Sequence, residues 1–270
     1  MSVQNFIPQI WSKEILDSLE KECVLVDSCH RAYEGDVKYA GSVKILGVGE
    51  PTIGNYTVGQ DISIEELSDE GQVLNIDQRK YFAFYVDDVD KAQSVPGLPE
   101  EYQRKSTHKL AEARDSFVAG LIKTATNATT ATALSAEGVL NAIDEGIIAL
   151  RERDFSEDGV IELNPRAAKL FMKNLITLST DNPEYIKKGT IGMYDGFVVK
   201  MSNNMAKDTT YSYCDIRGKK AIAFAAQLEK VEAMRAEKRF ADIVRGLDVY
   251  GGKVIDNDRI QVLKIPVKAS

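Results

Sequence analysis

The feature that most constrains this fold is a long β-type segment whose tip has too few apolar residues to form a core. From residue 39 to residue 86, short runs rich in Val, Ile, Tyr and Phe are broken by glycines, a pattern typical of strands. Ser68 and Gly71 stand first and last in a four-residue stretch, as a type I turn prefers, and this turn joins residues 62–67 to residues 72–77. We therefore predict a long two-stranded ribbon. A lone hairpin is marginally stable in water, so we expect the ribbon to lie on another surface.

The pattern of apolar residues predicts which end of the ribbon is buried. From residue 81 to residue 86 both faces of the returning strand are apolar, so we expect burial on both sides there and an exposed tip. The tip is acidic, and we expect it to meet basic residues of a neighbouring subunit, with a merely solvated loop as the alternative. The expected assembly interface comprises Ile62, Ile64, Glu65, Glu66, Asp69 and Glu70.

Three helices are predicted after the ribbon. The longest spans residues 98–126, with Pro99 in its first turn and an apolar stripe at helical spacing. A second helix starts after Ser135 as N-cap, and a third starts after Asn164. Short strand-like runs, two of them joined by an Asp-Gly turn, fill most of the remaining sequence. The predicted fold class is therefore α+β.

Charge and cysteine content narrow the class of protein. The chain has 34 Lys and Arg against 41 Asp and Glu, a formal net charge of −7, so no excess of cations is available to neutralise a phosphate backbone. Dedicated nucleic-acid binding is disfavoured. The three cysteines form no CxxC pair and no even set, which indicates a reducing compartment and buried thiols. No signal peptide and no long apolar run is found, so we expect neither secretion by that route nor a membrane span.

One four-residue motif, Tyr85-Val86-Asp87-Asp88, also occurs at the metal-binding turn of reverse transcriptases and related polymerases. Two-metal catalysis needs several carboxylates that converge on two cations, in a site that accepts a polyanion. The chain has no basic template groove and no Gly-rich phosphate loop, so we interpret the motif as a buried strand with aspartates at its exit. We predict no catalytic, cofactor or metal site. The alternative from another class is a two-metal nucleotidyl transferase that uses Asp87 and Asp88.

Four long blocks in fixed order resemble the major capsid protein family of tailed phages, which has the Hong Kong 97-type fold. They are FIPQIWSKEIL, YFAFYVDDVDKAQ, GTIGMYDGFVVKMSNN and KAIAFAAQLEKVEAMRAEKRFADIVRGLDVYGGKV. The resemblance implies three parts: an N-terminal arm (residues 1–38), an extended β-ribbon loop (39–86), and a spine helix with interleaved peripheral and axial domains (87–270). It also implies that residues 227–246 are largely extended, against their helical propensity.

The resemblance further implies function through assembly rather than catalysis. Many copies would form hexamers and pentamers in an icosahedral shell around double-stranded DNA, which the acidic chain would enclose without sequence-specific binding. Scaffolding, portal and decoration proteins are the expected partners, and too little chain precedes the ribbon for a built-in scaffolding segment. The expected location is the virion, after assembly in the cytoplasm of a bacterial host. The alternative within this fold is an encapsulin-like compartment that holds a cargo enzyme.

Overall fold

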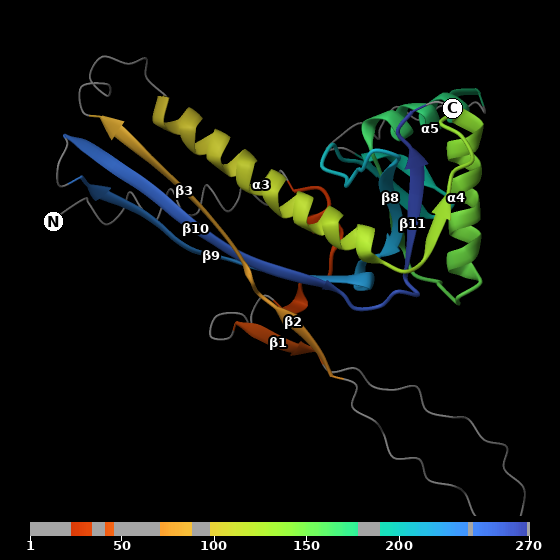
Figure 1. Cartoon of the computed structure of the whole chain (residues 1–270), viewed down its shortest axis with the longest axis horizontal. Helices are drawn as coiled ribbons and strands as arrows, with labels where there is room; N and C mark the ends of the chain where they lie inside the picture. The colour runs from red at the N-terminus through yellow and green to blue at the C-terminus, as the bar shows by residue number, and fades with distance from the viewer. Residues whose placement is uncertain are drawn as a thin grey trace, which may run out of the picture.

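The computed structural model has a rounded lobe at one end and a long sheet, flanked by one helix, that extends from it (Figure 1). The combination confirms the predicted α+β class. The structure describes residues 23–33, 41–45, 71–87, 98–177, 190–236 and 240–268.

The long sheet has three antiparallel strands in the order β3-β10-β9. They span Gln78–Asp87 (β3), Ala241–Val254 (β10) and Ile222–Arg235 (β9). The expectation that residues 227–246 are largely extended is confirmed, because β9 and β10 pair across most of that interval. Pairing of β10 on both of its edges supplies the backbone hydrogen bonds that a helix would otherwise provide, so tertiary structure overrides helical propensity here.

The long helix α3 (Leu98–Thr124) lies along one face of this sheet (Figure 1). Phe84 stacks on Tyr102 at 5.8 Å, and Phe117 meets the edge of Tyr250 at 5.4 Å. A buried ion pair also joins the helix to β10. The other face is open: Tyr81 is 80% exposed, so the expectation that residues 81–86 are buried on both sides is wrong for the single subunit, because α3 covers one side only.

The rounded lobe contains a six-stranded mixed sheet in the order β4-β11-β8-β5-β7-β6. Two helices, α4 (Ala136–Arg151) and α5 (Pro165–Thr177), pack with it and with each other. The strands are Ala128–Thr130 (β4), Gly159–Leu163 (β5), Thr190–Tyr194 (β6), Phe197–Met201 (β7), Tyr211–Gly218 (β8) and Ile260–Pro266 (β11). Short 3₁₀ turns at Val26–Ser28 (η2) and Lys219–Ala221 (η5) complete the elements.

Helix-capping and turn residues mark where elements of this lobe begin and end, as the sequence predicts. The Ser135 side chain accepts a hydrogen bond from the Gly138 amide, and Asn164 Oδ1 accepts one from the Ala167 amide at 2.7 Å, so both predicted N-caps are confirmed. The turn between β6 and β7 has Asp195 at φ 48° and Gly196 at φ 86°, the left-handed conformations that a tight hairpin needs.

A short strand pair, β1 (Ser42–Ile45) with β2 (Gln72–Asn75), forms the base of the predicted ribbon. The described partner of residues 72–75 is therefore the segment 42–45, whereas the turn pattern predicts a hairpin with residues 62–67, which lie outside the described residues. A local turn pattern does not show which distant segment a strand meets.

The ribbon base packs against β10 at Gly251, where an added Cβ would overlap the backbone of Asn75 and Ile76. Because backbone rather than a flexible side chain fills that space, β10 approaches the ribbon base this closely only where the residue is glycine.

Two glycine-to-alanine substitutions should therefore have opposite effects on stability. Gly251→Ala should destabilise the subunit by a few kcal/mol, since two backbones must separate, within the range of ~1–3 kcal/mol known for overpacked sites. Gly120→Ala, on the exposed side of α3 with no atom near the new Cβ, should stabilise it by about 1 kcal/mol. Urea unfolding should give a lower midpoint for Gly251→Ala and a higher midpoint for Gly120→Ala than for the unchanged protein. Equal midpoints in the two variants would contradict the close packing at Gly251.

Candidate functional site

The six residues of the predicted assembly interface lie outside the described residues. What the structure does describe is how the ribbon base is fixed to the subunit. Gln72 Nε2 donates a hydrogen bond of 3.0 Å to the Ile255 carbonyl. A small hydrophobic cluster holds the same base, made by Val43, Ile45, Leu74, Ile76, Ala223 and Ala225. The base of the predicted ribbon is therefore fixed to the subunit by a hydrogen bond and by apolar packing, and the role of the acidic tip stays a prediction.

The open face of the long sheet is a candidate contact surface. Tyr81 and Tyr85 are 80% and 60% exposed. A hollow of about 530 Å³ lies there, lined in part by Leu247 and by the ion-paired Arg245 and Glu232. Neighbouring exposed aromatic residues with a polar rim are typical of a surface that another protein covers.

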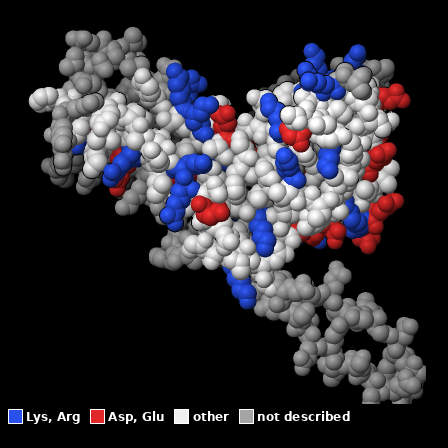
Figure 2. Space-filling view, viewed as in Figure 1, with Lys and Arg blue, Asp and Glu red and all other residues white. Residues whose placement is uncertain are grey.

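The rounded lobe has edges of opposite charge. Three acidic residues are exposed on or next to α4, namely Glu137, Glu145 and Glu152, and three basic residues are exposed on α5, namely Arg166, Lys169 and Lys173. Figure 2 shows the same division, with Lys and Arg along the top of the lobe and Asp and Glu along its outer and lower edge. Copies of one chain packed head to tail bring two different edges together, so edges of opposite charge suit a head-to-tail contact between copies.

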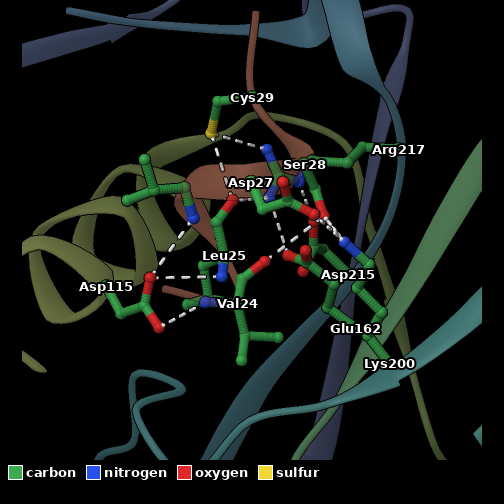
Figure 3. Close-up of polar contacts among 11 residues, drawn as sticks. Val24, Leu25, Asp27, Ser28, Cys29, Asp115, Glu162, Lys200, Asp215 and Arg217 are labelled. Carbon is green, nitrogen blue, oxygen red and sulfur yellow. Dashed lines mark hydrogen bonds and ion pairs between the residues drawn. The ribbon is translucent and has the colours of Figure 1, made fainter. Parts of the chain in front are cut away.

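A third candidate site is a buried polar cluster that fastens residues 23–30 to the lobe (Figure 3). On one side, the Asp115 carboxylate of α3 accepts hydrogen bonds from the amides of Val24, Leu25 and Val26 at 3.0, 3.1 and 3.2 Å. Burial raises the pKa of Asp115, and these amides oppose that rise because they favour the charged form. A single carboxylate thus satisfies most of the amide donors at the start of the η2 turn.

On the other side, Arg217 of β8 is completely buried and contacts the same turn. Its guanidinium donates hydrogen bonds to the Leu25 carbonyl at 3.0 Å and to Cys29 Sγ at 3.1 Å. Its charge faces two buried carboxylates: Glu162 Oε2 lies 2.7 Å away, and Asp215 Oδ2 lies 2.8 Å from Nε as an ion pair without hydrogen-bond alignment.

Sequence reasoning did not identify this cluster, although a pattern was present. Glu162 interrupts the apolar run of β5, and Asp215 and Arg217 occupy alternate positions of β8. Buried charges at period-two spacing in a strand predict an internal polar network. Which charges meet depends on strand register, which places Glu162 directly opposite Asp215.

The polymerase-like motif is not gathered into a metal site by the described residues. Asp87 ends β3 opposite Ala241, and Asp88 lies outside the described residues. Across the described part of the chain, no three His, Cys, Asp or Glu side chains come together in a way that could hold a metal ion. Among the same residues no helix is long and apolar enough to cross a membrane. The three cysteines are free and buried, as predicted.

Comparison with solved structures identifies the fold and the family. A chain from Mycobacterium phage Che8 is 30% identical, with a TM-score of 0.75, over 89% of this chain and 90% of that one. The capsid of cyanophage P-SCSP1u matches at 16% identity and a TM-score of 0.70, over 87% of this chain and 85% of that one. A virus-like particle from Pyrococcus furiosus matches at 13% identity and a TM-score of 0.61, over 95% and 99% of the two chains. No protein-family model and no curated protein matches the sequence.

These structures define the chain as a shell-forming capsid protein. More narrowly, it belongs to the major capsid protein family of tailed phages and has the Hong Kong 97-type fold. The resemblance found in the four sequence blocks is therefore confirmed, and so is the expected class of self-associating virion protein.

Proposed function

We propose that this chain is the major capsid protein of a tailed bacteriophage and that its hexamers and pentamers close into an icosahedral shell around double-stranded DNA. The observation that carries the proposal is the 30% identity to the phage Che8 chain over nine-tenths of both chains. A match of this length includes the long sheet, α3 and the lobe together rather than one shared motif.

The surfaces support assembly through several contacts per subunit. The α4 and α5 edges suit head-to-tail packing in a ring, while the open face of the long sheet suits a contact with a further copy. A chain with a net charge of −7 would enclose DNA without binding its phosphate backbone tightly. We propose a structural role without catalysis, and scaffolding, portal and decoration proteins as partners. Assembly would take place in the cytoplasm of a bacterial host.

The first test is the size of the purified chain. We expect rings or closed shells in negative-stain micrographs and megadalton species in sedimentation, with or without a co-expressed scaffolding protein, because assembly buries the exposed aromatic residues. Sedimentation should respond to salt if the oppositely charged edges meet. A protein that stays monomeric under every condition, with the partner present, contradicts the proposal.

The second candidate is an encapsulin-like compartment, favoured by the match to the Pyrococcus furiosus virus-like particle over 95% of this chain. Particles isolated from the native source distinguish the two. A uniform length of double-stranded DNA inside the shell supports the phage capsid, whereas a stoichiometric enclosed enzyme without such DNA supports the compartment.

A further inference from the structure

The buried cluster in Figure 3 has an imbalance of charge that its surroundings do not correct. One guanidinium, that of Arg217, faces the carboxylates of Glu162 and Asp215, and all three side chains are completely buried. Strand register holds the two carboxylates directly opposite each other, where like charges repel. Glu162 Oε1 and both Asp215 oxygens accept no hydrogen bond. Such a pair is stable when one carboxyl carries a proton that the other shares.

The groups around the pair come from every element packed against it. Lys200 lies next to Glu162 across β7, but its Nζ bonds Asp27 and Ser28 at 2.9 Å, which takes that charge to the outer side of the turn. Asp115 of α3 adds a further negative charge nearby. On the β11 side the residue opposite Asp215 is Val262, which is uncharged.

The thiols Cys29 and Cys214, also next to the pair, are buried, and burial is the largest cause that raises the pKa of each. Both thiols therefore stay in the uncharged form and contribute no charge to the cluster. The named neighbours leave the pair without a second cation, and a proton is the simplest way to neutralise it.

We propose that residues 23–30 form a latch on the lobe and that the latch stays closed only while the Glu162–Asp215 pair holds a proton. The latch is fastened by Asp115 at its first amides, by Arg217 at Leu25 and Cys29, and by a bridge of His30 to β9. Because Arg217 bonds the latch and the carboxyl pair with one guanidinium, a second negative charge in the pair draws the guanidinium away from the latch and favours entry of water. Opening then exposes the pair and releases its proton.

The direction of the pH dependence follows from this linkage. Burial first, and then the charge of Glu162, raise the pKa of Asp215 well above its ordinary value in the closed latch. The closed form therefore binds more protons than the open form. Its stability is complete below the ordinary carboxyl pKa and is lost as the pH rises towards the raised value. One proton released per opening changes the opening constant about tenfold per pH unit within that window.

The latch also has an internal reporter. Cys23 and Cys29 belong to the latch, whereas Cys214 belongs to β8, and all three thiols are free and buried. Reaction of the latch thiols with iodoacetamide therefore reports latch opening, and reaction of Cys214 reports unfolding of the lobe. Dividing the rate in the fully unfolded chain by the native rate at the same pH gives a protection factor free of the thiolate effect.

The test measures these factors in the full-length subunit by peptide mass spectrometry from pH 5 to pH 9. We expect the protection of Cys29 to fall about tenfold per pH unit over part of this range, while that of Cys214 changes much less. Asp215→Asn, which keeps that position neutral, should flatten the dependence, and Glu162→Gln should do the same if the first variant does not fold. Lys200→Met is the matched control, since it removes an outer contact and should lower Cys29 protection equally at every pH.

Two results overturn the latch. One is equal protection of Cys29 and Cys214 at every pH, which would mean that the segment opens only with the lobe. The other is an unchanged pH dependence in both Asp215→Asn and Glu162→Gln, which would assign the proton to another group. The latch is measured on the single subunit, whereas the proposed function is tested by shell assembly. The latch can therefore be refuted while shells still form, and it can be supported even if shells do not form.

Discussion

Replacing residues 57–70 by a short Gly-Ser turn should remove closed shells from the sedimentation profile while the subunit still folds. The described ribbon base, β1 with β2, stays in place in this variant, including the Gln72 bond to Ile255. Each halving of a loop changes its closure cost by only about 0.6 kcal/mol, so thermal unfolding of the unassembled subunit should change little. The sequence of the removed segment is too polar to support a core, and its acidic tip suits a neighbouring subunit.

A second variant separates the length of the ribbon from its charge. Changing Glu65, Glu66, Asp69 and Glu70 to their amides keeps the length, so shells should form but should lose part of their salt sensitivity. If the shortened protein forms regular shells, the removed segment makes no contact between subunits that assembly requires. A shortened protein that fails to fold would assign the ribbon to the core.

The elements that sequence predicted well are those specified by local chemistry. The α3 helix was expected at residues 98–126 and spans Leu98–Thr124, and Ser135 and Asn164 cap the helices that follow. Caps and turns act within a few residues, so their patterns can be read without knowledge of the fold. The extended state of residues 227–246 was different, because their propensity is helical and only the family resemblance predicted β9 and β10.

The features that sequence reasoning missed depend on which elements meet. Alternation in residues 81–86 shows two apolar faces, but it cannot show that α3 covers the side of Phe84 and leaves Tyr81 open. In a shell protein a neighbour can cover the second face, so apolar sequence is consistent with exposure in the single subunit. The buried cluster was missed for a related reason: strand register, which pairs Glu162 with Asp215, lies beyond any single segment.

The Arg114–Asp248 pair joins α3 to β10, and breaking it should give the largest loss of subunit stability. The two side chains are 5% and 0% exposed, and Arg114 Nε donates a hydrogen bond of 2.8 Å to Asp248 Oδ2. Arg114→Met leaves a buried carboxylate without its partner, which costs about 3–5 kcal/mol. In a chain of this size each kcal/mol lowers the melting temperature by roughly 2–4 °C. Calorimetry and urea unfolding should both show the loss.

The double variant Arg114→Met with Asp248→Leu tests whether the cost comes from the unpaired charge or from lost packing. Replacing both partners of a buried pair with apolar residues is often neutral or stabilising by about 1–4 kcal/mol, so most of the stability should return.

The matched control is Arg245→Met on the same strand, whose partner is Glu232; those side chains are 54% and 39% exposed. An exposed pair contributes at most about 1 kcal/mol. If Arg114→Met costs no more than Arg245→Met, the helix is held to the sheet by its aromatic contacts and the buried charges add nothing. If the double variant remains as unstable as the single one, the loss lies in the shape of the Arg114 side chain rather than in its charge.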